Sequence, residues 1–171
     1  SLFTNYRRAD GESMRRTFAD EVYKLMKKDD DIFVLTGDLG YGVWDMVKSE
    51  FPERYINTGA AEQSMMDIAV GLAFSGKTPI VYSITPFLLW RPAETIRTYI
   101  NHESIKVIMV GSGRGEDYKH DGYSHNASDD MDLMRCFPNI DSRHPDSKQE
   151  VVKIVKSIKK IDKPMYINLR K

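Results

Sequence analysis

Short apolar runs and amphipathic stretches take turns from one end of the chain to the other. The runs that we expect to form strands are residues 32–35, 54–57, 79–83, 106–110 and 165–169, with a further short strand near Ile140. Helical periodicity lies between them, at about 12–28, 92–101, 130–135, 147–161 and in the stretch after Glu62. Runs that are apolar throughout are typical of parallel strands buried on both faces. The sequence therefore predicts a doubly wound α/β domain, with helices on both faces of a mostly parallel sheet.

Three of these helices carry an apolar stripe at α-helical spacing. The stripes consist of Met14, Phe18, Val22, Leu25 and Met26 in the first helix, Met65, Ile68, Ala69, Leu72 and Ala73 in the one after Glu62, and Val151, Ile154, Val155 and Ile158 in the last. Each stripe is expected to face the core. Glu62 stands in the first turn of its helix, where a carboxylate commonly does no more than complement the macrodipole. Held rigidly beside an apolar pocket, however, such a carboxylate can hold or share a proton at neutral pH.

Four loops are expected to leave the carboxyl ends of strands. They span residues 37–43, 59–64, 84–90 and 111–130. In open α/β sheets, ligands bind at the carboxyl ends of the strands, so these loops are expected to converge on one site. The last loop is long, polar and glycine-bearing, which is typical of loops that carry function.

Composition removes several classes of protein. The 171 residues suit one domain, and 25 basic residues balance 25 acidic ones, which leaves no net field to attract nucleic acid or an anionic membrane. Cys136 is the only cysteine, which excludes an internal disulfide and fits a reducing compartment. No apolar run is long enough to cross a bilayer, and residues 1–8 contain no signal-peptide core. We expect a cytoplasmic protein.

Four motifs occur in a specific order. They are Gly37-Asp38-Leu39, the stretch 59–64 with Glu62-Gln63 before an alanine- and glycine-rich helix, the stretch 83–90, and a Gly-x-Ser-His turn at 122–125. Lesser marks are Pro138-Asn139, Pro145-Asp146 and Glu150. In this combination, residues 12–170 resemble the pyrimidine-binding domain of transketolase-like enzymes that depend on thiamine diphosphate.

The resemblance implies a cofactor site. Glu62 matches the family's acid that engages the ring nitrogen of the aminopyrimidine and so allows thiamine diphosphate to lose a proton from its thiazolium carbon. Phe87 and Trp90 stand where the family places aromatic side chains against the pyrimidine, and Ile84 takes a position that is often aromatic. Asp38 is implied to contact the cofactor from the first loop. Ordinary core packing is the alternative role for these apolar residues.

The same resemblance implies a substrate site in the long loop. His125 matches a histidine that faces substrate oxygens and can shuttle protons. Asp121 matches a residue that contacts substrate hydroxyls in sugar-using members. His120 replaces an acidic or small residue, Tyr123 replaces a proline of many relatives, and residues 115–118 form an unusual insertion. The substrate is therefore left open.

The family's diphosphate-binding features are not found in this sequence. In the family, a separate domain with a Gly-Asp-Gly motif and a later Asn holds the diphosphate through Mg²⁺. Here residues 37–40 read Gly-Asp-Leu-Gly rather than Gly-Asp-Gly, and Asn57 follows them at too short a spacing. We therefore expect no metal ligands in this chain. Residues 1–171 are expected to be one pyrimidine-binding domain of a split enzyme, without the diphosphate-binding and C-terminal domains. It would be inert until it meets a diphosphate-binding subunit, in an α2β2 assembly.

Three functions fit these residues. The first is transfer of a two-carbon ketol unit from a sugar to an aldehyde acceptor, favoured by His125 and Asp121. The second is a subunit of a 2-oxo-acid decarboxylase, whose corresponding turn would not be expected to read Asp-Gly-x-Ser-His. The third is a non-catalytic domain that has kept the fold, which would have no need for an acid at Glu62.

Overall fold

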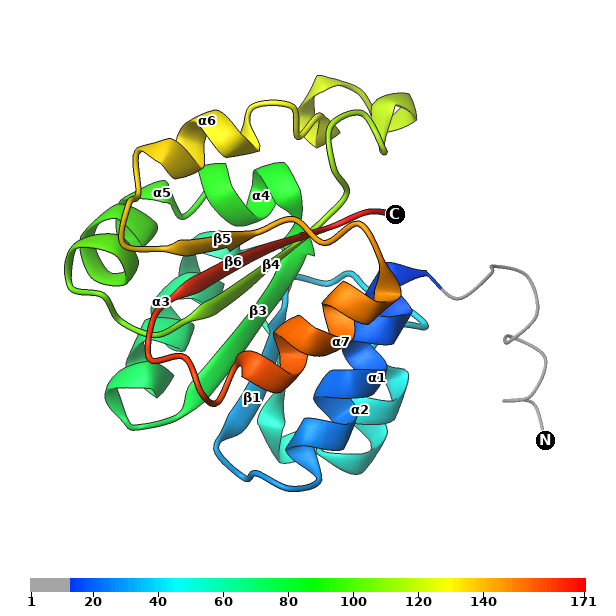
Figure 1. Cartoon of the computed structure of the whole chain (residues 1–171), viewed down its shortest axis with the longest axis vertical. Helices are drawn as coiled ribbons and strands as arrows, with labels where there is room; N and C mark the ends of the chain where they lie inside the picture. Colours follow the sequence, from blue (N-terminus) through cyan, green and yellow to red (C-terminus); the bar gives the residue numbers. More distant parts are fainter. Residues whose placement is uncertain (1–12) are drawn as a thin grey trace.

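The protein is built on a sheet of six parallel strands. The computed structural model describes residues 13–171. The strands are β1 (Ile32–Thr36), β2 (Tyr55–Asn57), β3 (Thr78–Ile84), β4 (Ile108–Ser112), β5 (Asp141–Arg143) and β6 (Met165–Leu169), and their spatial order is β2-β1-β3-β4-β6-β5. Every neighbouring pair is parallel, so all carboxyl ends lie at one edge (Figure 1). The predicted doubly wound α/β fold is confirmed.

Helices cover both faces of the sheet (Figure 1). One face packs against α1 (Met14–Met26), α2 (Asp45–Glu50) and α7 (Lys148–Ser157). The other packs against α3 (Glu62–Phe74), α4 (Thr85–Trp90), a π-helix at Ile96–His102 and α6 (Asp130–Arg135). The short helix α5 (Ala93–Thr95) joins α4 to the π-helix, and 3₁₀ turns lie at Pro52–Arg54, Lys119–Asp121 and Tyr123–His125.

Two apolar clusters, one on each face, form the core. The first contains the buried Trp44, which makes edge-to-face contacts with two other rings. Its ring centroid lies 6.2 Å from that of Phe18 and 5.4 Å from that of Tyr82. The second packs Met65 and Ile96 against the opposite face of the same strands. Burying a large apolar side chain contributes about 1.5–3 kcal/mol, so these two layers hold the strand ends in place.

The stripes predicted for α1 and α7 face the core, and the one predicted for α3 does so at Met65, Ala69, Leu72 and Ala73 but is wrong at Ile68. Ile68 is 41% exposed, and the buried positions are Glu62, Met65, Met66, Ala69 and Val70. This helix is apolar on more than one side, so periodicity alone did not show which side packs on the sheet. The true stripe starts at Glu62, which places the carboxylate on the buried face. The predicted start of α1, at residue 12, lies outside the described residues.

Other predictions miss their boundaries. Residues 84–90, expected to be a loop, form α4, which starts with Thr85 and has Pro86 in its first turn, where the missing N–H is tolerated. The helix predicted at 92–101 is the short α5 followed by the π-helix. The strands predicted at 106–110 and near Ile140 lie slightly later, as β4 and β5.

Candidate cofactor and substrate site

The carboxyl edge of the sheet brings Glu62 next to the end of β1. Gly37 follows β1 directly, and a Cβ atom at this position would lie 3.4 Å from Glu62 Oε1 and 3.3 Å from the carbonyl oxygen of Gly59. The distance to Gly59 is slightly tighter than an ordinary contact, and the distance to Glu62 is at the lower limit of one. A side chain at residue 37 would therefore crowd Gly59 and fill the space beside the carboxylate, and glycine leaves that space open.

Glu62 is a buried carboxylate at the start of α3. It is 3% exposed, and Met65 and Met66 continue the same buried face into the core. Ala61, which precedes the helix, has no side-chain oxygen with which to cap it. Glu62 is the acidic residue of the first turn, where a negative charge complements the helix dipole. A buried carboxylate requires a partner, because an unpaired charge in an apolar site costs several kcal/mol.

Arg91 supplies that partner. Its Nη1 donates to Glu62 Oε2 at 2.8 Å, and the central carbon of its guanidinium lies 3.9 Å from the centre of the Phe87 ring. Phe87 and Arg91 are four residues apart at the end of α4, which places both side chains on one face. Arg91 was not among the site residues predicted from the sequence. A cation four residues after the expected pyrimidine-stacking aromatic was the signal that could have indicated it.

His125 also contacts Phe87. The two rings are 4.8 Å apart at an interplanar angle of 69°, and Ser124 Oγ lies 3.0 Å from His125 Nδ1. The structure thus places Glu62, Arg91, Phe87 and His125 in one continuous row. These residues come from α3, α4 and the loop after β4, so three of the expected loops do meet.

The loop that carries His125 is fastened to the body of the protein. Tyr118 hydroxyl contacts Ser112 Oγ at 2.8 Å and accepts from Arg15 Nη1 at 3.1 Å, and its ring lies 6.4 Å from His125. Gly113 has a φ of +92°, and a Cβ there would lie 2.4 Å from the Tyr118 ring. The unusual insertion at 115–118 therefore anchors the loop.

A second anchor of the same loop is a buried polar cluster around Asp130. Asp130 Oδ2 accepts from Tyr166 Oη at 2.8 Å and from Asn168 Nδ2 at 3.1 Å, and His144 Nε2 lies 3.4 Å away. Burial favours a raised pKa for Asp130, but the hydrogen bonds from His144 and Tyr166 outweigh it and hold the pKa below its ordinary value. Burial, reinforced by the Asp130 charge, raises the pKa of Tyr166 well above its ordinary value.

The remaining predicted site residues lie at the end of β3 or in the segments that follow β1, β3 and β4. Asp38, with a φ of 56°, is exposed; its backbone N–H donates to Asn57 Oδ1 at 2.9 Å, and its carboxylate accepts from the Tyr41 hydroxyl at 3.0 Å. It therefore ties the loops after β1 and β2 together. The other four are the half-buried Ile84, the 49% exposed Trp90, and the exposed His120 and Asp121. Their contacts with cofactor or substrate stay predictions.

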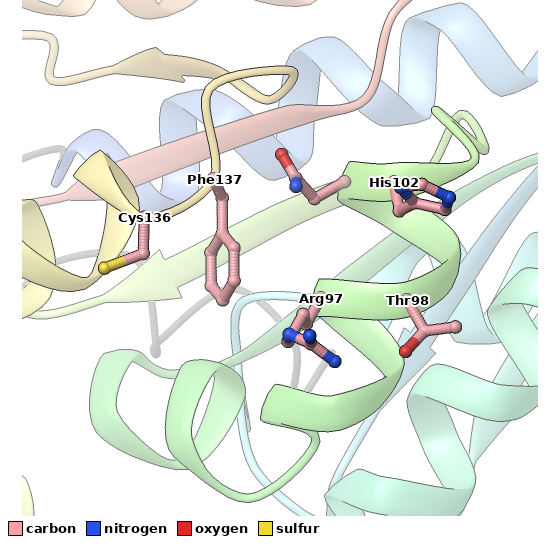
Figure 2. Close-up of a pocket in the computed structure, with 6 residues that line it drawn as sticks. Arg97, Thr98, His102, Cys136 and Phe137 are labelled. Atoms are coloured by element: carbon pink, nitrogen blue, oxygen red, sulfur yellow. The ribbon is translucent and has the colours of Figure 1, made fainter.

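A pocket of about 420 Å³ lies elsewhere, between the π-helix and the end of α6. Figure 2 shows the Phe137 ring in it, between Cys136 on one side and Arg97 of the π-helix on the other. Its lining includes none of the predicted site residues. Over residues 13–171, no group of three or more His, Cys, Asp or Glu side chains is arranged to hold a metal ion. No helix in that part of the chain is long and apolar enough to cross a membrane.

The fold and the row of side chains at its carboxyl edge define a doubly wound α/β domain with a buried acid at its candidate site. Residues 10–171 match the family model described as "Transketolase, pyrimidine binding domain". The chain belongs to this family, and the resemblance noted in its sequence is confirmed.

Individual relatives are transketolase-like proteins. The chain is 31% identical over 159 residues to the "Putative transketolase C-terminal section" of Methanocaldococcus jannaschii, an alignment that covers 92% of this chain and 50% of that protein. It is 34% identical over 120 residues to a protein of Actinobacillus succinogenes that is named as one of the subunits of an apulose-4-phosphate transketolase, covering 70% and 39%. A solved structure titled "Split gene transketolase, inactive beta4 tetramer" matches with a TM-score of 0.81 and 31% identity, over 94% of this chain and 52% of that one. The chain spans about half the length of these relatives, or less.

Proposed function

We propose that this chain is the pyrimidine-binding part of a split transketolase-like enzyme, a transferase that moves a two-carbon ketol unit from a sugar to an aldehyde acceptor. The observation that carries the proposal is the buried Glu62 paired with a planar cation stacked on Phe87. Thiamine diphosphate, bound at this site together with Mg²⁺ held by a partner chain, would supply the carbanion-stabilising chemistry that ketol transfer requires.

The contacts of Glu62 and Phe87 support a site for an aminopyrimidine. The guanidinium of Arg91 is flat, carries N–H donors and stacks on an aromatic face, and all three properties are shared by a protonated aminopyrimidine. Glu62 Oε2 accepts the hydrogen bond, and the missing side chain at Gly37 leaves room beside Oε1. A ring that enters between Glu62 and Phe87 would thus find an acceptor and an aromatic wall.

Each residue then has a role that follows from its place. Glu62 would share a proton with the ring nitrogen. Its carboxylate is buried, so water would not compete with the ring for this hydrogen bond. Phe87 would provide the apolar wall of the slot. Ile84, just before α4, and Trp90, its last residue, would add to that wall. His125, beside Phe87, faces the substrate and moves protons at its oxygens.

The exposed side chains of the same loop would select the substrate. His120 and Asp121 are exposed in the loop that carries His125 and would bind hydroxyl groups of a sugar. Asp38 would contact the cofactor from the loop after β1.

A partner chain completes the proposed enzyme. Large aromatic side chains are exposed in the segments that follow β1, β3 and β4: Tyr41 is 82% exposed, Trp90 49% and Tyr123 88%. Aromatic residues are enriched at protein interfaces, and these three lie in the segments that also carry the candidate site residues. The Actinobacillus relative is named as one subunit of its transketolase, which supports a two-chain enzyme. We propose a diphosphate-binding subunit that supplies the Mg²⁺ ligands, in an α2β2 assembly.

The test is to reconstitute the chain with a partner that carries the Gly-Asp-Gly and Asn motif. Ketol transfer from a ketose phosphate to an aldehyde is measured with thiamine diphosphate and Mg²⁺, and 2-oxo-acid consumption is measured in parallel. Glu62→Gln is expected to lower ketol transfer by at least about 100-fold, because general acid–base catalysis contributes 10²–10⁴-fold. Glu94→Gln, which changes an exposed glutamate of α5, serves as the control.

Three outcomes would contradict the proposal. Near-normal turnover by Glu62→Gln would remove the role of the acid. Consumption of a 2-oxo acid without ketol transfer would assign the chain to a decarboxylase. Cofactor binding without exchange of the thiazolium proton for deuterium would indicate a non-catalytic domain.

A further inference from the structure

Arg91 occupies the position that the proposed function reserves for the cofactor's ring. It meets the same two groups, the carboxylate of Glu62 at 2.8 Å and the face of Phe87 at 3.9 Å. A guanidinium and a pyrimidine cannot both lie in the one slot between these groups. Cofactor entry therefore requires that Arg91 leave.

Arg91 can turn into solvent without being buried elsewhere. Its side chain is 46% exposed, whereas that of Glu62 is 2% exposed. The guanidinium can therefore turn into solvent and regain water as a partner, while Glu62 cannot. The carboxylate would be left unpaired in its buried site unless another donor took the place of Arg91.

We propose that Arg91 is a positioning residue, which holds the place of the pyrimidine ring on Glu62 until the cofactor enters. The inference rests on the proposed function. In the cofactor-free protein, the ion pair keeps Glu62 oriented toward the slot and satisfies its buried charge. On cofactor entry, the ring nitrogen takes over the hydrogen bond and Arg91 moves to solvent.

This exchange has a measurable consequence for affinity. The apparent dissociation constant of a ligand equals its intrinsic value divided by the fraction of protein in the open state. An ion pair that is closed in about nine of ten molecules weakens binding about tenfold, which is in the range of one charge-assisted hydrogen bond. Removing Arg91 is therefore expected to tighten cofactor binding, although the residue touches the very groups that bind the ring.

The experiment titrates thiamine diphosphate, at saturating Mg²⁺, into the complex of this chain with its diphosphate-binding partner. Calorimetry gives the dissociation constant for wild type, Arg91→Ala and Arg91→Lys. Arg97→Ala, an exposed arginine of the π-helix, is the control. We expect about tenfold tighter binding for Arg91→Ala, a smaller gain for Arg91→Lys, which keeps the charge but loses the planar fork, and no change for Arg97→Ala.

A second readout separates this role from a merely structural one. The melting temperature of the Arg91→Ala complex is expected to fall below that of wild type without cofactor, and to match it at saturating cofactor, because only the cofactor-free state loses an interaction. If Arg91→Ala does not fold, tighter binding by Arg91→Lys tests the same point.

Failures of the two proposals differ. Unchanged or weaker binding by both Arg91 variants, with normal binding by wild type, would overturn this inference alone. Failure of the wild-type complex to bind thiamine diphosphate would overturn the proposed function, and this inference with it.

Discussion

Asp130→Asn is expected to weaken the fold at the base of the candidate site. In the native protein three groups converge on Asp130 Oδ2: the Tyr166 hydroxyl at 2.8 Å, the Asn168 amide at 3.1 Å and His144 Nε2 at 3.4 Å. The other oxygen, Oδ1, accepts from the backbone N–H of Met131 at 2.7 Å. An asparagine has only one oxygen, so in either orientation its NH₂ group would face a donor.

The expected loss in the free energy of unfolding follows from the number of hydrogen bonds that Asp130→Asn removes. A hydrogen bond to a charged group contributes about 1.5–3 kcal/mol, and a buried donor left without an acceptor costs about 1–3 kcal/mol. Asn168 retains other acceptors, including the carbonyl oxygen of Gly113 at 3.1 Å, which limits the loss. We therefore expect the free energy of unfolding to fall by about 3 kcal/mol. For a chain of this size that corresponds to a decrease of about 6–12 °C in melting temperature.

The assay is urea denaturation of the full chain, with Asp132→Asn as the matched control. Asp132 lies on the same helix, but its side chain is 74% exposed and its pairing with Arg135 lies on the surface, so a change of less than about 0.5 kcal/mol is expected. Equal stability of Asp130→Asn and wild type would refute the reasoning. So would an equal loss in Asp132→Asn.

The effect is also expected to depend on pH. The pKa of Asp130 lies below its ordinary value near 3.8 in the folded state, so its stabilisation is fully present above that value. The stabilisation is lost as the pH falls through the lower, folded-state pKa. The difference in unfolding free energy between wild type and Asp130→Asn should therefore be retained down to about pH 5 and narrow below pH 4. A difference that did not change over this acid range would contradict the charge-based explanation.

Three further substitutions test two local features of the fold. Gly113→Ala places a Cβ 2.4 Å from the Tyr118 ring at a φ of +92°, and is expected to lose about 3 kcal/mol or more in a denaturant titration. Gly76→Ala, with a φ of +81° and open space around it, is expected to lose only about 1–2 kcal/mol, and equal losses would contradict the role of the clash. Ser147→Ala removes the hydroxyl that accepts from the Glu150 backbone N–H at 3.2 Å and caps α7, at an expected cost of about 1 kcal/mol. An unchanged unfolding midpoint for this variant would show that the cap contributes nothing.

Much of the architecture could be predicted because it depends on local periodicity. The stripes of α1 and α7 each have one clearly apolar side, so Val22 and Val155 could be placed in the core from their spacing. Apolar runs without alternation indicated parallel strands, and parallel strands place their carboxyl ends at one edge. The convergence of the Glu62, Phe87 and His125 segments follows from that alone.

Predictions failed where the local sequence was equally compatible with two structures. α3 is apolar on several sides, and only its contact with the sheet decides that Met66 is buried and Ile68 is not. Residues 85–90 are too short to show a helical period, yet Pro86 and the packing of Leu88 and Leu89 on the sheet make them a helix. In both cases the partner surface, which is distant in sequence, selects the conformation.

Residue order and chemistry were sufficient to indicate an α/β domain, its ligand-binding edge and the family to which it belongs, because these depend on periodicity and on motifs that are contiguous in the chain. The pairing of Arg91 with Glu62, the glycine at 37 beside the carboxylate and the polar cluster around Asp130 were decided only by the tertiary structure. Apart from the contact between Asp130 and His144, each joins residues about 25 or more positions apart. Such contacts form only once the sheet has set the distance and direction between the segments, and neither quantity is written in the local spacing of side chains.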